Sequence, residues 1–155
     1  QNVYVYGPSN SGKSFILKSL RSIFNAFTNP ATGTFAWFGV EDAEVVLLNN
    51  FHWHPSIIAW ADFLQLLEGD IVHIAAPKNV CSKDIEFKQD TPFVATADAP
   101  IVLVKGGCLD QCNTQMMEVR WVFFHFWRQK PEECQIELPA CPKCFARLII
   151  DYSDI

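Results

Sequence analysis

The fold class follows from eight consecutive residues, Gly7-Pro8-Ser9-Asn10-Ser11-Gly12-Lys13-Ser14. They match the pattern G-x-x-x-x-G-K-S/T, a glycine-rich loop that joins a β-strand to an α-helix. The neighbouring segments fit this context, because residues 3–6 are β-branched and aromatic and residues 14–27 carry apolar side chains at helical spacing. The sequence therefore predicts a strand, a loop and a helix in succession. A glycine-rich turn that binds nothing is the alternative.

The residue types in this loop suit a phosphate chain and a magnesium ion. Glycines allow the backbone to turn its N–H groups toward phosphate oxygens, and the positive end of the following helix faces the same anion. In such loops the lysine, here Lys13, reaches the β and γ phosphates, and the hydroxyl of the next residue, Ser14, coordinates Mg²⁺. We therefore expect ATP and Mg²⁺ as cofactors, bound by residues 7–14.

The composition is that of one folded domain. Half of the 155 residues are apolar and 19% are charged, which excludes intrinsic disorder, a coiled coil and a collagen-like fibre. The net charge of −5 means that contact with nucleic acid requires a local basic element. No apolar run approaches the length of a bilayer span, so no membrane partner is expected. The absence of cysteine from the first eighty residues favours reduced thiols in an intracellular protein over a disulfide framework.

Strand patterns and helix patterns alternate along the chain. Beyond residues 3–6, strands are predicted at residues 34–40, 44–48, 93–96, 101–104 and 121–126, and helices at residues 14–27, 55–67 and 111–118. Residues 71–75 and 84–87 flank a Pro-Lys-Asn turn, which indicates a β-hairpin that projects from the sheet. Apolar strands between helices are typical of a parallel sheet. The sequence thus predicts a single α/β domain over residues 1–155, with a mainly parallel sheet, flanking helices and a projecting hairpin.

Three later segments follow the loop in a fixed order. Residues 45–53 (VVLLNNFHW) are an apolar run followed by polar and aromatic residues, residues 91–98 (TPFVATAD) are a strand that ends near Asp98, and residues 117–126 (MEVRWVFFHF) place Arg120 before an apolar strand. With the loop and the hairpin, their order and spacing resemble superfamily 3 helicases. These are the AAA+ motor domains of replication initiators such as parvoviral non-structural proteins and Rep proteins of circular single-stranded DNA viruses. In this resemblance, residues 45–53 correspond to the Walker B strand and residues 91–98 to motif C.

The resemblance implies a P-loop NTPase of AAA+ type, without the family's N-terminal helical segment. It implies an ATPase and DNA helicase that couples ATP binding and hydrolysis to translocation on single-stranded DNA during DNA replication. The working form would be a homo-oligomeric, hexamer-like ring in the nucleus. Arg120 of one subunit would then act as an arginine finger toward the γ-phosphate held by the next subunit. An ion pair of Arg120 with Glu118 or another acid is the alternative, and Arg128 is a second candidate finger.

Two positions depart from the family pattern in opposite directions. Asn49 and Asn50 stand where the family has two carboxylates, one for Mg²⁺ and one for the attacking water. An amide cannot act as a base at neutral pH, and loss of a general base typically costs 10²–10⁴-fold in rate. ATP binding is therefore expected to survive better than hydrolysis. Asp98 places a carboxylate where the family has a neutral sensor. A turn residue before Ala99-Pro100 is the favoured interpretation, and the hypothesis beside it is that Asp98 supplies the missing negative charge.

The predicted hairpin carries the clustered positive charge of the first hundred residues. Its tip contains Lys78 and Lys83. In a ring, several copies would form a basic collar that contacts single-stranded DNA through its phosphates. From charge alone, an ordinary solvated turn is an equal alternative.

The cysteines near the end of the chain raise a separate question. Cys141 and Cys144 form a C-x-x-C pair, and Cys134 lies seven residues before it. A zinc site would need a fourth ligand such as Cys108, Cys112 or His125. Free thiols that pack under a terminal helix are the favoured interpretation.

Two other functions remain open from the sequence. A degenerate P-loop module would bind ATP as an assembly switch without hydrolysing it, which the two asparagines favour. A nucleotide or small-molecule kinase is less favoured, because kinase lids usually carry several arginines and this chain has four in total. DNA-stimulated ATP turnover, tight binding without turnover, and phosphate transfer to a small acceptor distinguish the three.

Overall fold

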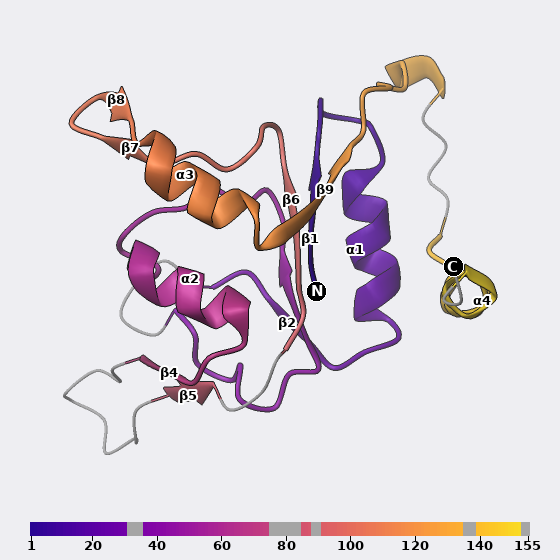
Figure 1. Cartoon of the computed structure of the whole chain (residues 1–155). Helices are drawn as coiled ribbons and strands as arrows, with labels where there is room; N and C mark the ends of the chain where they lie inside the picture. The colour runs from indigo at the N-terminus through magenta and orange to yellow at the C-terminus, as the bar shows by residue number, and fades with distance from the viewer. Residues whose placement is uncertain (31–35, 75–84, 88–90, 135–138, 153–155) are drawn as a thin grey trace.

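The centre of the fold is a parallel β-sheet. The computed structural model of the chain describes residues 1–30, 36–74, 85–87, 91–134 and 139–152. These residues form a five-stranded sheet in the order β2-β3-β6-β1-β9, in which each adjacent pair is parallel (Figure 1). The strands are β1 (Asn2–Tyr6), β2 (Ala26–Thr28), β3 (Val45–Leu48), β6 (Phe93–Ala97) and β9 (Trp121–His125). The prediction of an α/β fold with a mainly parallel sheet is confirmed.

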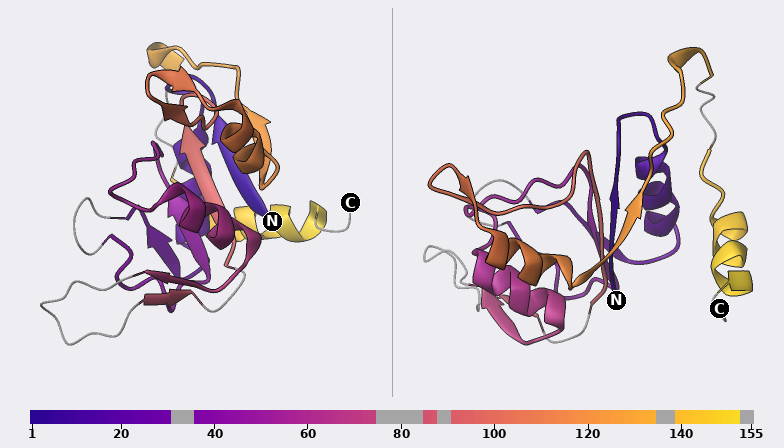
Figure 2. Two further views of the ribbon diagram at one scale, coloured as in Figure 1. Left: turned by 60° about the vertical axis from the view of Figure 1, so that its left-hand side comes forward. Right: turned by 45° about the horizontal axis from the view of Figure 1, so that its top comes forward.

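Helices cover both faces of this sheet. Helix α1 (Lys13–Arg21) lies on one face, and α2 (Trp60–Glu68) and α3 (Gln111–Glu118) lie on the other, as Figures 1 and 2 show. A fourth helix, α4 (Pro142–Tyr152), lies beyond α1 (Figure 2). Because side chains alternate along a strand, β3 serves both faces: Val45 and Leu47 pack with Leu17 of α1, whereas Val46 and Leu48 join the core under α2 and α3.

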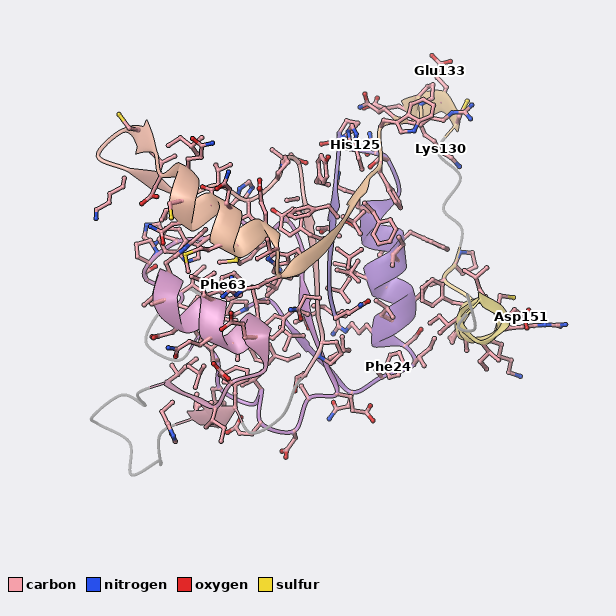
Figure 3. The ribbon with its side chains drawn as sticks, in the orientation of Figure 1. Phe24, Phe63, His125, Lys130, Glu133 and Asp151 are labelled. Atoms are coloured by element: carbon pink, nitrogen blue, oxygen red, sulfur yellow. The ribbon has the colours of Figure 1, made fainter. Side chains whose placement is uncertain are left out.

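The larger core lies between the sheet and α2 and α3. Phe63 of α2 is fully buried, and its ring centroid lies 6.3 Å from those of Phe93 and Trp121 (Figure 3). Tyr4 packs edge-on against Trp121 at 5.3 Å. At the start of β1, the buried Asn2 amide donates to the Leu67 carbonyl at 2.8 Å and accepts from the backbone N–H of residue 93 at 3.1 Å. The buried polar group is therefore satisfied, and it ties α2 to the sheet.

The first predicted helix is shorter than its apolar spacing indicates. It ends at Arg21, and residues 26–28 form β2, so the prediction of a helix over residues 14–27 was wrong at its end. The Ser22 hydroxyl donates to the Ser19 carbonyl at 2.7 Å, which satisfies a carbonyl of the last turn. The Phe27 ring then stacks on Trp37, at 5.8 Å, instead of continuing the helical face. Tertiary packing thus overrides the helical pattern.

Two predicted strands were also wrong. The strand predicted at residues 34–40 is absent from its described part, because residues 36–39 form a turn; residues 34 and 35 lie outside the described residues. In this turn the buried Trp37 donates its indole N–H to the Ile57 carbonyl at 2.9 Å. The apolar character of this segment therefore serves the core without a strand. Of residues 101–104, only Val104 is in a strand: β7 (Val104–Lys105) pairs with β8 (Cys108–Leu109) across Gly106-Gly107.

Helices α2 and α3 have clear starts and ends. Helix α2 begins at Trp60 rather than at residue 55, because residues 55–57 form a turn, and it ends before Gly69, whose φ of 84° suits glycine. Helix α3 begins after Asp110, whose carboxylate accepts from the Asn113 backbone N–H at 3.1 Å and from its amide at 2.7 Å. These hydrogen bonds lower the pKa of Asp110.

The stem of the predicted hairpin is present. Strands β4 (Val72–Ile74) and β5 (Ile85–Phe87) are antiparallel, and Phe87 packs edge-on against Trp37 at 5.7 Å. The stem lies at the end of the molecule opposite the loop that follows β1 (Figure 1). Lys78 and Lys83 lie outside the described residues. Within the described part of the chain, no helix has both the length and the apolar character that a membrane crossing requires.

Candidate functional site

The predicted loop follows β1 and requires both of its glycines. Gly7 has a φ of 147°, and a Cβ at this position would lie 2.1 Å from the Phe126 carbonyl oxygen. Its N–H donates to the Ala97 carbonyl at 3.2 Å, which holds the start of the loop against β6. Gly12 has a φ of 90° and directly precedes α1. Since L side chains disfavour such φ values, glycine suits both positions. The predicted strand, loop and helix are thus confirmed.

Lys13 is a buried cation inside the loop. Only 6% of its side chain is exposed. Its ammonium donates to the carbonyls of Gly7 at 2.6 Å and Pro8 at 2.7 Å, and it lies 3.5 Å from the Ser11 hydroxyl. Asp98 approaches from the end of β6, with its carboxylate 3.7 Å from the ammonium and 65% of its side chain exposed. The loop therefore places one positive charge next to one negative charge at the carboxyl edge of the sheet.

Ser14 contacts the end of β3. Its hydroxyl donates to the side-chain oxygen of Asn49 at 3.2 Å. The same oxygen accepts from the Thr96 hydroxyl of β6 at 3.0 Å, and this hydroxyl accepts from the Asn50 backbone N–H at 3.1 Å. The predicted residues Ser14, Asn49 and Asn50 are thus brought together. Sequence reasoning missed Thr96, although a buried polar residue at the end of an apolar strand was a usable signal.

A second asparagine, also missed, holds the backbone after β3. The Asn49 N–H donates to the Asn29 side-chain oxygen at 2.6 Å, and the Asn29 amide donates to the Asn49 carbonyl at 3.2 Å. Among the described residues, the non-glycine positions with positive φ are Asn10, Asn29 and Asn50. Asparagine adopts this left-handed region more readily than most residues. Backbone geometry therefore explains part of the asparagine content of this edge.

These groups surround two adjacent hollows. The first, of about 330 Å³, is lined by residues 9–15 together with Asn50 and Asp98. The second, of about 240 Å³, shares Ser11 with the first and is otherwise lined by residues 125–128, which are the last residue of β9 and the three that follow it. In open α/β sheets, ligands bind at the carboxyl ends of the strands, which is where both hollows lie.

Arg120 lies at the other edge of the sheet. It directly precedes β9, whose first residue, Trp121, is in register with Asn2 at the start of β1. Its guanidinium pairs with Glu68 at the end of α2 and donates to the Met116 carbonyl, and 13% of its side chain is exposed. Arg120 is thus remote from the loop of its own chain. The alternative, an ion pair of Arg120 with Glu118 or another acid, is therefore present, and the acid is Glu68.

The terminal cysteines do not form a recognisable metal centre. Within the described ranges, no three His, Cys, Asp or Glu side chains are grouped closely enough to hold a metal ion. Cys134, Cys141 and Cys144 are exposed, so the expectation that they pack under the terminal helix was wrong. The hydrogen bond with the Cys144 thiol, followed by that with its backbone N–H, lowers the pKa of Cys141. The same thiol–thiol contact raises the pKa of Cys144.

No protein-family model matches the chain, and a search of curated proteins found no similar sequence.

Proposed function

We propose that the chain binds Mg²⁺–ATP at the carboxyl edge of its sheet, as a P-loop NTPase of AAA+ type that resembles superfamily 3 helicases. The observation that carries this proposal is the convergence of the ends of two strands, β3 and β6, on the glycine-rich loop. Ser14 contacts Asn49, which directly follows β3, and Lys13 contacts Asp98, which directly follows β6. A phosphate chain in the first hollow would contact Lys13, and a magnesium ion would take the Ser14 hydroxyl as a ligand.

Asp98 is the proposed source of the negative charge that Asn49 and Asn50 lack. Among the described residues that line the first hollow, Asp98 is the one carboxylate. It is largely exposed, and its distance of 3.7 Å from the Lys13 ammonium places it beside the phosphate site. A carboxylate there can orient a water molecule, whereas the Asn49 oxygen can accept a hydrogen bond from a Mg²⁺-bound water. Hydrolysis is therefore proposed to persist at a reduced rate.

Translocation on single-stranded DNA in a ring is the proposed use of this ATPase. The support is the described hairpin stem, which lies at the end of the sheet opposite the loop and leads into the segment with Lys78 and Lys83 (Figure 1). In such a ring, Arg120 would exchange Glu68 for the phosphate of a neighbouring subunit. A nuclear location rests on the family resemblance alone.

A switch that binds ATP without turnover is the second candidate function. The observation in its favour is the pair of amides at Asn49 and Asn50, because neither can take a proton from water at neutral pH. In this case the contacts of the loop with the ends of β3 and β6 would change when a nucleotide binds, and this change would alter binding to a partner or to another copy of the chain.

Steady-state ATPase assays with and without single-stranded DNA test these functions. The proposed motor requires Mg²⁺-dependent turnover that DNA stimulates and that Lys13→Ala abolishes. Asp98→Asn is expected to lower the rate by 10²-fold or more if its carboxylate serves the attacking water. An unchanged rate would exclude that role for Asp98. ATP binding without turnover would select the switch, and no binding of ATP by folded protein would refute both functions.

A further inference from the structure

The second hollow lies beside the phosphate loop and is not used by the proposed phosphate and magnesium contacts. It has a volume of about 240 Å³ and is lined by Ser11, His125, Phe126, Trp127 and Arg128. Ser11 also lines the first hollow, so the two adjoin at the loop. A ligand whose phosphates occupy the first hollow can therefore extend into the second.

The segment after β9 is attached to the loop at both of its ends. The Phe126 N–H donates to the Tyr6 carbonyl at 2.8 Å, just before the loop, and the Lys130 N–H donates to the Asn10 carbonyl at 3.1 Å within it. Figure 3 shows His125 and Lys130 at the same end of the molecule, where β9 ends. Residues 127–129 are thus held next to the loop by backbone hydrogen bonds.

This attachment presents one large aromatic side chain to the solvent. Trp127 is 74% exposed, although it is fixed between two backbone anchors. Two other rings line the hollow: Phe126 is half-buried, and His125 is already stacked on Tyr6, with centroids 4.7 Å apart and planes 5° apart. Exposed aromatic rings that bind nucleotides do so by stacking on the face of the base. Arg128 adds a positive charge to the same wall.

We propose that the second hollow binds the base of the nucleotide, which stacks on Trp127 with Arg128 at its edge. This inference rests on the proposed function, because the phosphates held by the loop direct the base toward the hollow. Stacking uses a face that every base possesses, so the site would discriminate little among bases. The chain is therefore expected to bind ATP, GTP and CTP with affinities within about tenfold of one another.

Isothermal titration calorimetry on the full chain tests the base site with two probes, Mg²⁺–ATP and Mg²⁺–tripolyphosphate. Trp127→Leu should weaken ATP binding by roughly 5- to 100-fold, which is the usual contribution of one stacked base, and leave tripolyphosphate binding unchanged. Trp127→Phe is the matched control, because it keeps an aromatic face and should retain most of the ATP affinity. Circular dichroism and thermal melts confirm that each variant is folded.

Two outcomes would overturn the base site. One is ATP affinity that Trp127→Leu leaves unchanged; the other is an equal loss for ATP and tripolyphosphate, which would mean that the variant damages the loop itself. In either case, tripolyphosphate binding by the unaltered chain would leave the phosphate-loop proposal standing. If the unaltered chain binds neither probe, the proposed function fails and the base site with it.

Photolabelling of the unaltered chain with 8-azido-ATP gives a second measurement that does not depend on a variant. Covalent label on the peptide that contains residues 125–128 supports the proposal, and label confined to other peptides overturns it.

Discussion

Replacing the first glycine of the loop should be far more damaging than replacing the second. An alanine Cβ at Gly7 would lie 2.1 Å from the Phe126 carbonyl oxygen and 2.9 Å from its carbonyl carbon. Both distances are shorter than the 3.0 Å within which a Cβ atom essentially never approaches another heavy atom, and the opposing atoms belong to the backbone. Relief therefore requires the segment that follows β9, or the loop, to move by about 1 Å to restore ordinary contact.

Such a movement strains two hydrogen bonds that hold the loop in the sheet. They join the Phe126 N–H to the Tyr6 carbonyl at 2.8 Å and the Gly7 N–H to the Ala97 carbonyl at 3.2 Å. Their loss would cost about 1 kcal/mol each, and the positive φ would add about 1–3 kcal/mol of strain. Gly7→Ala should thus lower the free energy of unfolding by about 3–5 kcal/mol.

Gly12→Ala is the matched control. Its φ of 90° is also unfavourable for alanine, but nothing lies within 4 Å of the added Cβ. The expected loss is the backbone strain alone, about 1–2 kcal/mol. Urea unfolding monitored by circular dichroism measures both variants under one set of conditions. Equal losses, or a larger loss for Gly12→Ala, would refute the close packing of β9 against the loop.

Three further predictions concern single side chains. Thr96→Val removes the acceptor of the Asn50 N–H and should lower the free energy of unfolding by about 1–3 kcal/mol, as urea unfolding can measure. A loss below about 0.5 kcal/mol, which is typical of a surface substitution, would count against this contact. Asn49→Asp keeps an oxygen that can accept the hydrogen bonds of the Ser14 and Thr96 hydroxyls, so it should leave the free energy of unfolding nearly unchanged and raise the Mg²⁺-dependent ATPase rate. An unchanged ATPase rate would mean that residue 49 does not contribute to the metal site. The lowered pKa of Cys141 gives this thiol more thiolate near neutral pH, so the pH midpoint of its alkylation by iodoacetamide should be lower than that of Cys144. Cys144→Ala should raise the pH midpoint of Cys141 alkylation, and peptide mass spectrometry at a series of pH values measures both.

The sequence was sufficient where a continuous apolar run or a complete loop motif is present, including the edge strand β9, of which Val122 and Phe124 are exposed. Strands β3, β6 and β9 were predicted from continuous apolar runs, and the loop was predicted from its glycines and lysine. The errors fall where burial and secondary structure diverge. Trp37 is buried in a turn, and Phe27 continues a helical pattern but lies in a strand. Local spacing cannot distinguish these cases, because the partners that decide them, such as Ile57 and Val46, are distant in sequence.

The site shows the same division. Lys13 and Ser14 are recognisable from the loop pattern, since their spacing is fixed within one turn of chain. Thr96 and Asn29 lie at the site because β6 and β2 pair with β3 in a particular register. This register could not be predicted from the sequence. Arg120 was predicted as a site residue from its position in the sequence, but the parallel pairing of β9 with β1 places it at the edge of the sheet opposite the loop.

The side chain of Asn49, at the end of β3, bears on whether the carboxyl edge of the sheet binds a ligand. The Asn49 oxygen joins the Ser14 and Thr96 hydroxyls, and the bond to Ser14 is exposed. An exposed hydrogen bond contributes at most about 1 kcal/mol to folding, so stability alone gives little reason for Ser14 to meet β3 here. The same arrangement is what a magnesium site needs, because it holds a hydroxyl and an amide oxygen side by side. In the proposed function, Ser14 and Asn49 thus supply the neutral oxygens, and Asp98, at the neighbouring strand end, supplies the negative charge.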